Sequence, residues 1–251
     1  MSIKDRRTKI LLSLLLLSDK EFKSISYDSA TLHIFDLTMN RKTIATFKKL
    51  VKDGFVTEDE SKTDLPTYKL TTKGFHEITL SFPVFRFSKE DWDGVWRILS
   101  YEIPEKKREL RDRLRRQVSS WGLGPWHRSF WLTPHPIIPW LKDLISQEEK
   151  AYVQAFESKH VLGDQDILIE KVWATSQLEK KYRKLFMKWH DVLSKDEDKI
   201  KKMKLIIDDY IEIIKTDPGL PKELIGSKWI GFEAINLFKE IQTILLSSKD
   251  S

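Results

Sequence analysis

Residues 41–52 carry a dense group of cationic and hydroxyl side chains. They are Arg41, Lys42, Thr46, Lys48, Lys49 and Lys52. Such side chains bind phosphate oxygens and hydrogen-bond to base edges in the major groove of DNA. Arg41 and Lys42 come first, where a helix in the groove usually meets bases, and the later lysines are better placed for phosphates. The group predicts binding to double-stranded DNA. The alternative is a solvated helix with ordinary surface lysines.

This chemistry needs a helix with a cationic front and an apolar back. The apolar members of the stretch are Ile44, Phe47, Leu50 and Val51. At about 100° per residue they share one face of a helix, and the cations lie on the other side. Thr38 or Asn40 can cap the start of this helix, and Gly54 favours its end.

The first third of the chain has the outline of a winged helix-turn-helix. Residues 6–17 and 29–36 predict two helices before the cationic one, and residues 55–58 and 67–70 predict two strands after it. Residues 68–74, Tyr-Lys-Leu-Thr-Thr-Lys-Gly, are similar to an ending common in bacterial winged-helix regulators. Three helices and a two-stranded ribbon therefore predict a DNA-binding domain over residues 1–82.

The loop between the two strands is acidic. Within residues 59–66, Asp59, Glu60 and Asp64 face only Lys62 as a counter-charge. The phosphate backbone repels such a loop. We therefore expect this wing to stay clear of DNA or to contact another domain.

Residues 92–160 alternate strands and helices. The order is a strand at 95–103, a helix at 105–118, a hairpin that includes 130–132, a helix at 137–147 and a strand at 151–156. This order predicts a ferredoxin-like fold. The first helix buries a leucine and valine stripe and exposes arginines, among them Arg111, Arg115 and Arg116. These arginines are either solvated or bind phosphate, for which the planar guanidinium is well suited.

The middle and the end of the chain resemble the PaaX family, the transcriptional repressors of phenylacetate breakdown. Residues 92–132 resemble its middle domain, which itself is similar to a small CRISPR-associated nuclease fold. Residues 217–224 read D-P-x-L-P-x-x-L and residues 229–234 read W-x-G-x-x-A, as in its C-terminal signature. Trp173, followed by Leu178, Tyr182 and Phe186, resembles a family helix. Gly226 and Ser227 depart from the family pattern.

The resemblance implies a homodimeric repressor that binds a palindromic operator and is released by an aryl acyl-CoA effector. The residues expected to bind the effector are Arg111, Arg115, Arg116, Trp173 and Trp229. The fold class is then α+β, with a winged helix-turn-helix at 1–82, a ferredoxin-like middle domain at 92–160 and a mainly helical C-terminal domain at 166–251.

Composition limits the other functional classes. The net charge of +6 favours a polyanionic partner. The absence of cysteine excludes disulfides and thiol nucleophiles and fits a cytoplasmic protein. The apolar run at 10–17 is too short to cross a membrane, so it predicts a buried helix. We expect no cofactor, because the six histidines lack metal-ligand spacing and no nucleotide-binding motif is present.

Two other functions remain open. One is a metal-dependent nuclease that uses the middle domain, with Glu102 at the end of its first strand. Metal-assisted hydrolysis normally gathers several carboxylates about the ion, and the sequence offers no obvious second one nearby. The other is an adaptor whose winged helix binds protein. We expect a DNA-binding regulator and no enzymatic activity.

Overall fold

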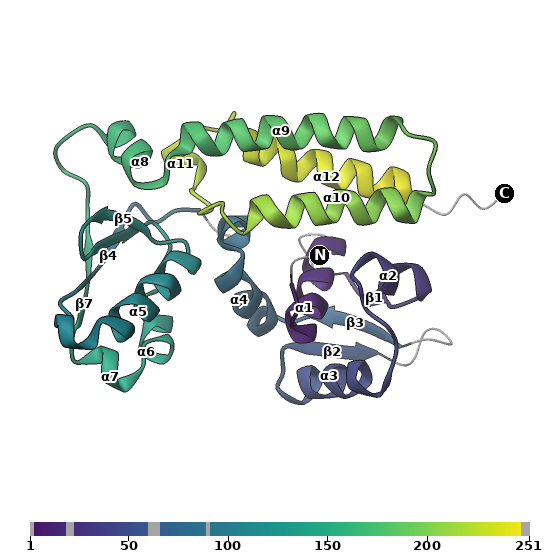
Figure 1. The fold of residues 1–251 in the computed structure, drawn as a ribbon, viewed down its shortest axis with the longest axis horizontal. Coiled ribbons are helices and arrows are strands. Elements are labelled where there is room, and N and C mark those ends of the chain that lie inside the picture. The colour runs from purple at the N-terminus through teal and green to yellow at the C-terminus, as the bar shows by residue number, and fades with distance from the viewer. Residues whose placement is uncertain (1–2, 19–22, 60–65, 89–90, 247–251) are drawn as a thin grey trace. The chain divides into compact units, whose positions relative to one another are not determined.

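The structure is a computed structural model that describes residues 3–18, 23–59, 66–88 and 91–246. It is an α+β structure with two antiparallel sheets and a helical C-terminal region (Figure 1). The chain forms two compact units. Met1–Thr79, Lys181–Ile213 and Ile230–Ser251 make unit 1, and Leu80–Lys180 with Ile214–Trp229 make unit 2. The expected division into three successive domains stays a prediction.

Unit 1 opens with three short helices. They are α1 (Arg6–Leu17), α2 (Ser29–Ile34) and α3 (Arg41–Lys52). Each starts after an Asp or Asn whose side chain accepts a hydrogen bond from a backbone N–H three residues on. For α3 this residue is Asn40, one of the two caps expected from the sequence, which accepts from the N–H of Thr43 at 3.0 Å. Such a cap satisfies a backbone donor that the helix itself leaves unpaired.

The leucine-rich stretch forms α1, whose central residues are buried. Ile10, Leu11, Leu12 and Leu14 are almost completely covered. The helix contacts both α3 and strand β3 (Thr67–Leu70), so it needs more than one apolar face. Within the described part of the chain, no helix is long and apolar enough to cross a membrane.

Unit 1 also contains a three-stranded antiparallel sheet, whose first strand lies between α1 and α2 in the chain. Its order is β1 (Ile25–Ser26), β3, then β2 (Val56–Asp59). Val56 lies opposite Leu70, and Asp59 lies opposite Thr67. Most of the acidic loop expected between β2 and β3, residues 60–65, lies outside the described residues. Helix α4 (Thr72–Ser81) then continues the chain where the sequence predicted only an end to the unit.

Long helices from the C-terminal part complete unit 1. They are the greater part of α9 (Thr175–Ser194), α10 (Lys199–Ile214) and α12 (Ile230–Leu246). Trp189, Tyr210 and Phe238, one from each helix, form an aromatic cluster with ring centroids 4.6–6.2 Å apart. Figure 1 shows these helices running along one another. Lys239 of α12 donates to the carbonyl of Leu16, so α12 also holds the C-terminal end of α1.

Unit 2 is built on a four-stranded antiparallel sheet. Its strands are β4 (Trp96–Tyr101), β5 (Gly124–His127), β6 (Phe130–Thr133) and β7 (Val153–Ser158), in the spatial order β5-β6-β4-β7. Helix α5 (Arg108–Ser120) separates β4 from β5, and α6 (Ile138–Leu144) and α7 (Gln147–Lys150) separate β6 from β7. The strand–helix–strand–strand–helix–strand order expected from the sequence is therefore present.

Each face of this sheet has its own core, because successive side chains of a strand point to opposite faces. Leu99 and Tyr101 of β4 pack in one cluster with Leu110 and Leu114 of α5. Trp96 and Ile98 belong to the other face, where they pack against α8 (Gln165–Trp173) and α11 (Lys222–Ile225). A short 3₁₀ helix, η1 (Pro83–Ser88), lies between the segments expected to form the first and the middle domain.

Candidate functional site

The back of α3 is fixed by three buried side chains. Thr43, Phe47 and Leu50 are each at most 1% exposed. The Thr43 hydroxyl donates to the carbonyl of Thr38 at 2.7 Å, and the Phe47 ring stacks on Tyr68 of β3 with centroids 4.2 Å apart. These contacts determine which side of the helix faces outward.

The front of α3 carries the predicted cations. Arg41, Lys42, Lys48, Lys49 and Lys52 are all exposed. None of them has a carboxylate partner among the residues that the structure describes. At about 100° per residue, Arg41, Lys48 and Lys52 lie roughly opposite the buried line through Thr43 and Leu50. The structure thus brings five predicted site residues onto one open surface.

Two residues of α3 differ from the expectation. Ile44, predicted to be part of the apolar back, is 42% exposed, and Thr43 takes its place in the core. A hydroxyl satisfied by a backbone carbonyl can be buried at low cost, which hydropathy does not register. Thr46, predicted to contact DNA, is partly buried, and its hydroxyl donates to the carbonyl of Lys42 at 2.8 Å. Its hydroxyl is therefore available to DNA mainly as an acceptor.

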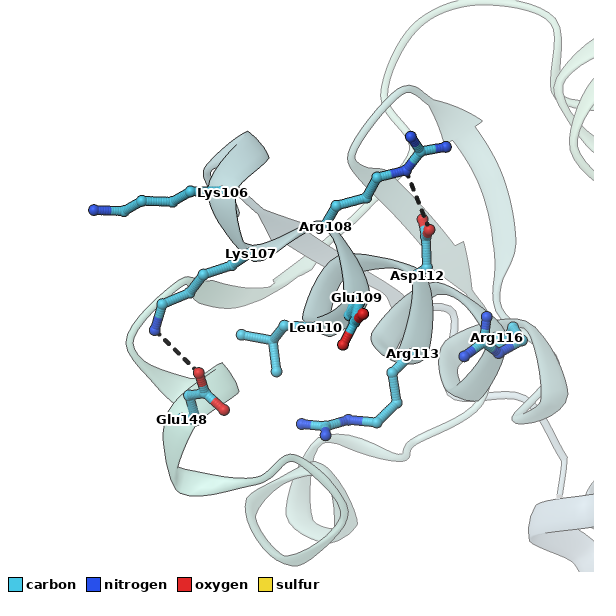
Figure 2. A pocket seen from close by; sticks show the side chains of 9 residues that line it. All are labelled: Lys106, Lys107, Arg108, Glu109, Leu110, Asp112, Arg113, Arg116 and Glu148. Atoms are coloured by element: carbon cyan, nitrogen blue, oxygen red, sulfur yellow. Dashed lines mark hydrogen bonds and ion pairs between the residues drawn. The ribbon is translucent and has the colours of Figure 1, made fainter.

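A second cationic surface lies along α5 in unit 2. An open groove of about 840 Å³ is lined by Lys106, Lys107, Arg108, Arg113 and Arg116, together with three acidic residues and Leu110. Figure 2 shows these side chains around the start of α5. Leu110, Leu114 and Val118 bury the other side of the helix, as the sequence predicted.

Acidic neighbours neutralise much of this second surface. Lys107 pairs with Glu148 at 3.0 Å and Arg108 with Asp112 at 3.6 Å, the two dashed lines in Figure 2. Arg111 pairs with Glu105 at 2.7 Å, and this hydrogen bond lowers the pKa of Glu105. In contrast, Lys106, Arg115 and Arg116 have no carboxylate partner in the described residues.

A fourth pair on this surface, between Arg113 and Glu149, is built into the fold. Arg113 donates to Glu149 at 3.2 Å, and Glu149 also caps α7 by accepting from Ser146. Burial by itself would raise the pKa of Glu149, but the hydrogen bonds from Ser146 and Arg113 outweigh it and hold the pKa below its usual range. Arg113 therefore has a structural role. Lys106, Arg115 and Arg116, which have no carboxylate partner in the described residues, are the better candidates for binding an anion.

The predicted effector residues lie on separate elements. Arg111, Arg115 and Arg116 share α5, and Arg116 lines its groove. Trp173 ends α8, where its ring stacks on Trp96 with centroids 6.0 Å apart and its Nε1–H donates to the carbonyl of Gly122 at 3.4 Å. Trp229 directly precedes α12. Trp173 thus supports the sheet of unit 2, a role that its place in a motif did not reveal.

The nuclease alternative gains no support from the geometry. Glu102 is exposed and directly follows β4. No group of three or more His, Asp or Glu side chains in the described ranges could hold a metal ion.

The comparisons with known proteins match the middle and C-terminal parts of the chain to described families. Residues 89–168 match the family described as the PaaX protein central Cas2-like domain, and residues 173–250 match the PaaX-like protein C-terminal domain. No curated protein matches the sequence. Among solved structures, the uncharacterized protein Rv0674 from Mycobacterium tuberculosis is similar in fold, with a TM-score of 0.54 at 17% identity over 94% of both chains. The two family matches together span more than half of the sequence, and the chain belongs to the PaaX family.

Proposed function

We propose that this chain is a sequence-specific DNA-binding regulator of transcription whose reading element is α3. The observation that carries the proposal is the exposed, unpaired group of Arg41, Lys42, Lys48, Lys49 and Lys52 on a helix whose back is locked by its core. A cation without a partner loses no protein contact when it meets phosphate. The membership of a family of regulators supports the same function.

The arrangement around α3 also supports it. Three helices, with β1 between the first two and the hairpin of β2 and β3 after the third, have the layout of a winged helix-turn-helix. In that motif the last helix enters the major groove and its N-terminal residues meet base edges. Arg41 and Lys42 are the first residues of α3 and are assigned to base contacts; Lys48, Lys49 and Lys52 are assigned to phosphates.

We further propose that the regulator is a homodimeric repressor. A dimer places two copies of α3 on an operator with two half-sites, about 34 Å apart or a multiple of this. The family resemblance implies release by an aryl acyl-CoA effector. Lys106, just before α5, and Arg115 and Arg116 of α5 are the residues assigned to its phosphates, since no carboxylate in the described residues neutralises them. Coupling between effector and operator would be about 1–3 kcal/mol.

The first experiment is selection of bound genomic fragments by the purified protein, followed by affinity measurements on the selected duplex. Lys42→Ala and Lys49→Ala should each weaken binding, because each removes a contact to DNA. Lys184→Ala, an exposed lysine of α9, is the control for loss of one charge and should bind as the wild type does. If Lys42→Ala and Lys49→Ala leave the affinity unchanged, α3 is not the reading element.

Two results would favour the other functions. Cleavage of RNA or DNA in Mg²⁺ or Mn²⁺ that Glu102→Gln abolishes would make the protein a nuclease. Absence of any salt-sensitive affinity for duplex DNA would favour an adaptor whose winged helix binds protein.

A further inference from the structure

Unit 2 contains a pocket on the face of its sheet opposite α5. The pocket has a volume of about 350 Å³. Its walls include Trp96 of β4, Trp126 of β5, Leu132 of β6 and Leu168 of α8. The end of β7 and its connection to α8, residues 159–164, close one side. The volume lies at the small end of the range of ligand pockets, about 300–1,000 Å³.

The walls of this pocket are apolar and aromatic. Trp126 is 40% exposed, although a large indole normally favours burial. Val161 and Leu162, at the tip of the closing connection, are each 89% exposed. Behind the pocket, Trp96 is held between neighbours, because it stacks on Trp173 and meets Trp92 edge to face. A rigid indole beside exposed apolar side chains can pack against a flat ring of a bound molecule.

The polar groups of the pocket are mostly donors. The Nε1–H of Trp96 is buried and has no acceptor among the described residues. An unsatisfied buried donor is unfavourable, so an acceptor brought by a bound molecule would stabilise it. Lys159 and His160 also line the pocket and can donate. Asp164 is already engaged, since it accepts from the N–H of Ile167 at the start of α8.

We propose that this pocket binds a small flat aromatic molecule whose polar group is an acceptor such as a carboxylate. The ring lies against Trp126 and the apolar wall, and the carboxylate faces Lys159, His160 and the Trp96 donor. The site uses none of the residues assigned to DNA or to effector phosphates. It therefore goes beyond the proposed regulatory function, and its binding is measured without DNA.

Calorimetric titration of the full chain with 2-naphthoate tests this inference. Trp126→Leu should weaken binding about five- to tenfold, the value of one aromatic contact. Phe130→Leu is the matched control, because Phe130 is an aromatic residue of similar exposure, 42%, that does not line the pocket. This control should bind as the wild type does.

Two further probes test the chemistry of the ligand. The cation 2-naphthylmethylamine keeps the ring and reverses the charge, and cyclohexylacetate keeps the charge and removes the flat ring. Both should bind more weakly than 2-naphthoate. In a ¹H–¹⁵N spectrum, the indole N–H resonance that Trp96→Phe removes should shift on binding.

Three results would overturn the inference. They are no measurable binding of 2-naphthoate, equal affinity in the wild type and Trp126→Leu, and equal affinity for the amine. Dissociation of a dimer by Trp126→Leu, without any binding of 2-naphthoate, would instead make this face an interface between two copies of the chain. Failure of operator binding would leave the inference standing, because the titration contains no DNA.

Discussion

His135 is a buried histidine whose surroundings keep it neutral. The ring lies in unit 2, is completely buried and stacks on Phe87 with centroids 4.6 Å apart. Its Nε2–H donates to the carbonyl of Pro218 at 2.7 Å, since a carbonyl oxygen only accepts. Burial lowers the pKa of His135 well below its ordinary value, and the nearby charge of Arg86 lowers it further.

This environment predicts a loss of stability in mild acid. Below a pH of about 6.5 the unfolded chain binds a proton that the folded chain does not, so the free energy of unfolding falls as the pH falls. The contribution of one such group is at most about 1.4 kcal/mol per pH unit. Urea unfolding between pH 7 and pH 5 measures it. His135→Gln should remove this part of the slope, and His33→Gln, at an exposed position, should keep it. Equal slopes in both variants would contradict the prediction.

The residues of α3 show what a single-residue property can and cannot predict. The spacing of Phe47 and Leu50 fixed the orientation of the helix correctly, and with it the exposure of the cations. The same spacing assigned Ile44 to the core, because isoleucine is apolar. The choice between Ile44 and Thr43 depends on the carbonyl of Thr38, which lies in the preceding turn and has no trace in the periodicity.

At the scale of the element, Thr71 and Gly74 explain how α4 begins. Thr71 donates its hydroxyl to the carbonyl of Phe55 at 3.0 Å and accepts from the N–H of Gly74 at 3.0 Å. A Cβ on Gly74 would lie 2.1 Å from the Phe55 oxygen and 2.8 Å from Leu70 Cδ1. The Thr-x-x-Gly of the sequence therefore starts a helix close against the backbone. The string was recognised in the sequence, but the helix that follows it was not.

Gly74→Ala should therefore lower the free energy of unfolding. Helix propensity alone would give a gain of about 0.5–1 kcal/mol, but the clash with backbone costs about 1–3 kcal/mol or more. Thr72→Ala, at an exposed position of the same helix, should stay within about 0.5 kcal/mol of the wild type. Chemical denaturation of the three proteins compares them. A more stable Gly74→Ala variant would show that no close approach exists.

A second element-scale contact joins the two ends of the chain within unit 1. Lys239 of α12 donates to the carbonyls of Leu16 and Ser18 at the end of α1, and Gln242 donates to the carbonyl of Leu17 at 3.4 Å. The last carbonyls of a helix lack partners within it and carry partial negative charge. The ammonium group of Lys239 donates hydrogen bonds to these carbonyls and also offsets their partial negative charge.

Lys239→Met keeps most of the apolar stem and removes the charged donor. It should destabilise unit 1 by about 1–2 kcal/mol, because the α1 carbonyls lose their partner. Lys184→Met, at an exposed position of α9, controls for the change of charge and should have little effect. Urea unfolding monitored by circular dichroism measures the difference. Equal stability of the two variants would show that the contact contributes nothing.

At the scale of the whole molecule, the sequence predicted local order better than association. The alternation of strands and helices over residues 92–160 and the helices of the C-terminal part came from patterns within short segments. The contact between α12 and α1 was not predicted from the sequence, because Lys239 and Leu16 are 223 positions apart and no local periodicity encodes that pairing. The pocket beside Trp96 was not predicted for the same reason, since its walls come from five elements and the connection between two of them.

The distribution of charge over the molecule leads to the last prediction. The net charge of +6 is carried by surfaces that differ in how far acids neutralise them. On α3 the five cations have no carboxylate partner in the described segments. In contrast, Lys107, just before α5, and Arg108, Arg111 and Arg113 of α5 are each paired with an acid. If α3 binds the duplex and α5 does not, each lysine of α3 that contacts a phosphate releases counterions from the DNA. The cations of α5 then release none.

Lys48→Ala and Lys52→Ala should therefore each reduce the slope of log affinity against log salt concentration by about 0.9. Arg115→Ala and Arg116→Ala remove the same charge from α5 and should leave that slope unchanged, because we assign these arginines to an effector. Fluorescence anisotropy on the selected duplex between 50 and 200 mM salt, roughly the range where such slopes are steep, gives all four values. A loss of slope in the α5 variants equal to that in the α3 variants would mean that the duplex also contacts unit 2, and the separation of the two cationic surfaces into DNA and effector sites would be wrong.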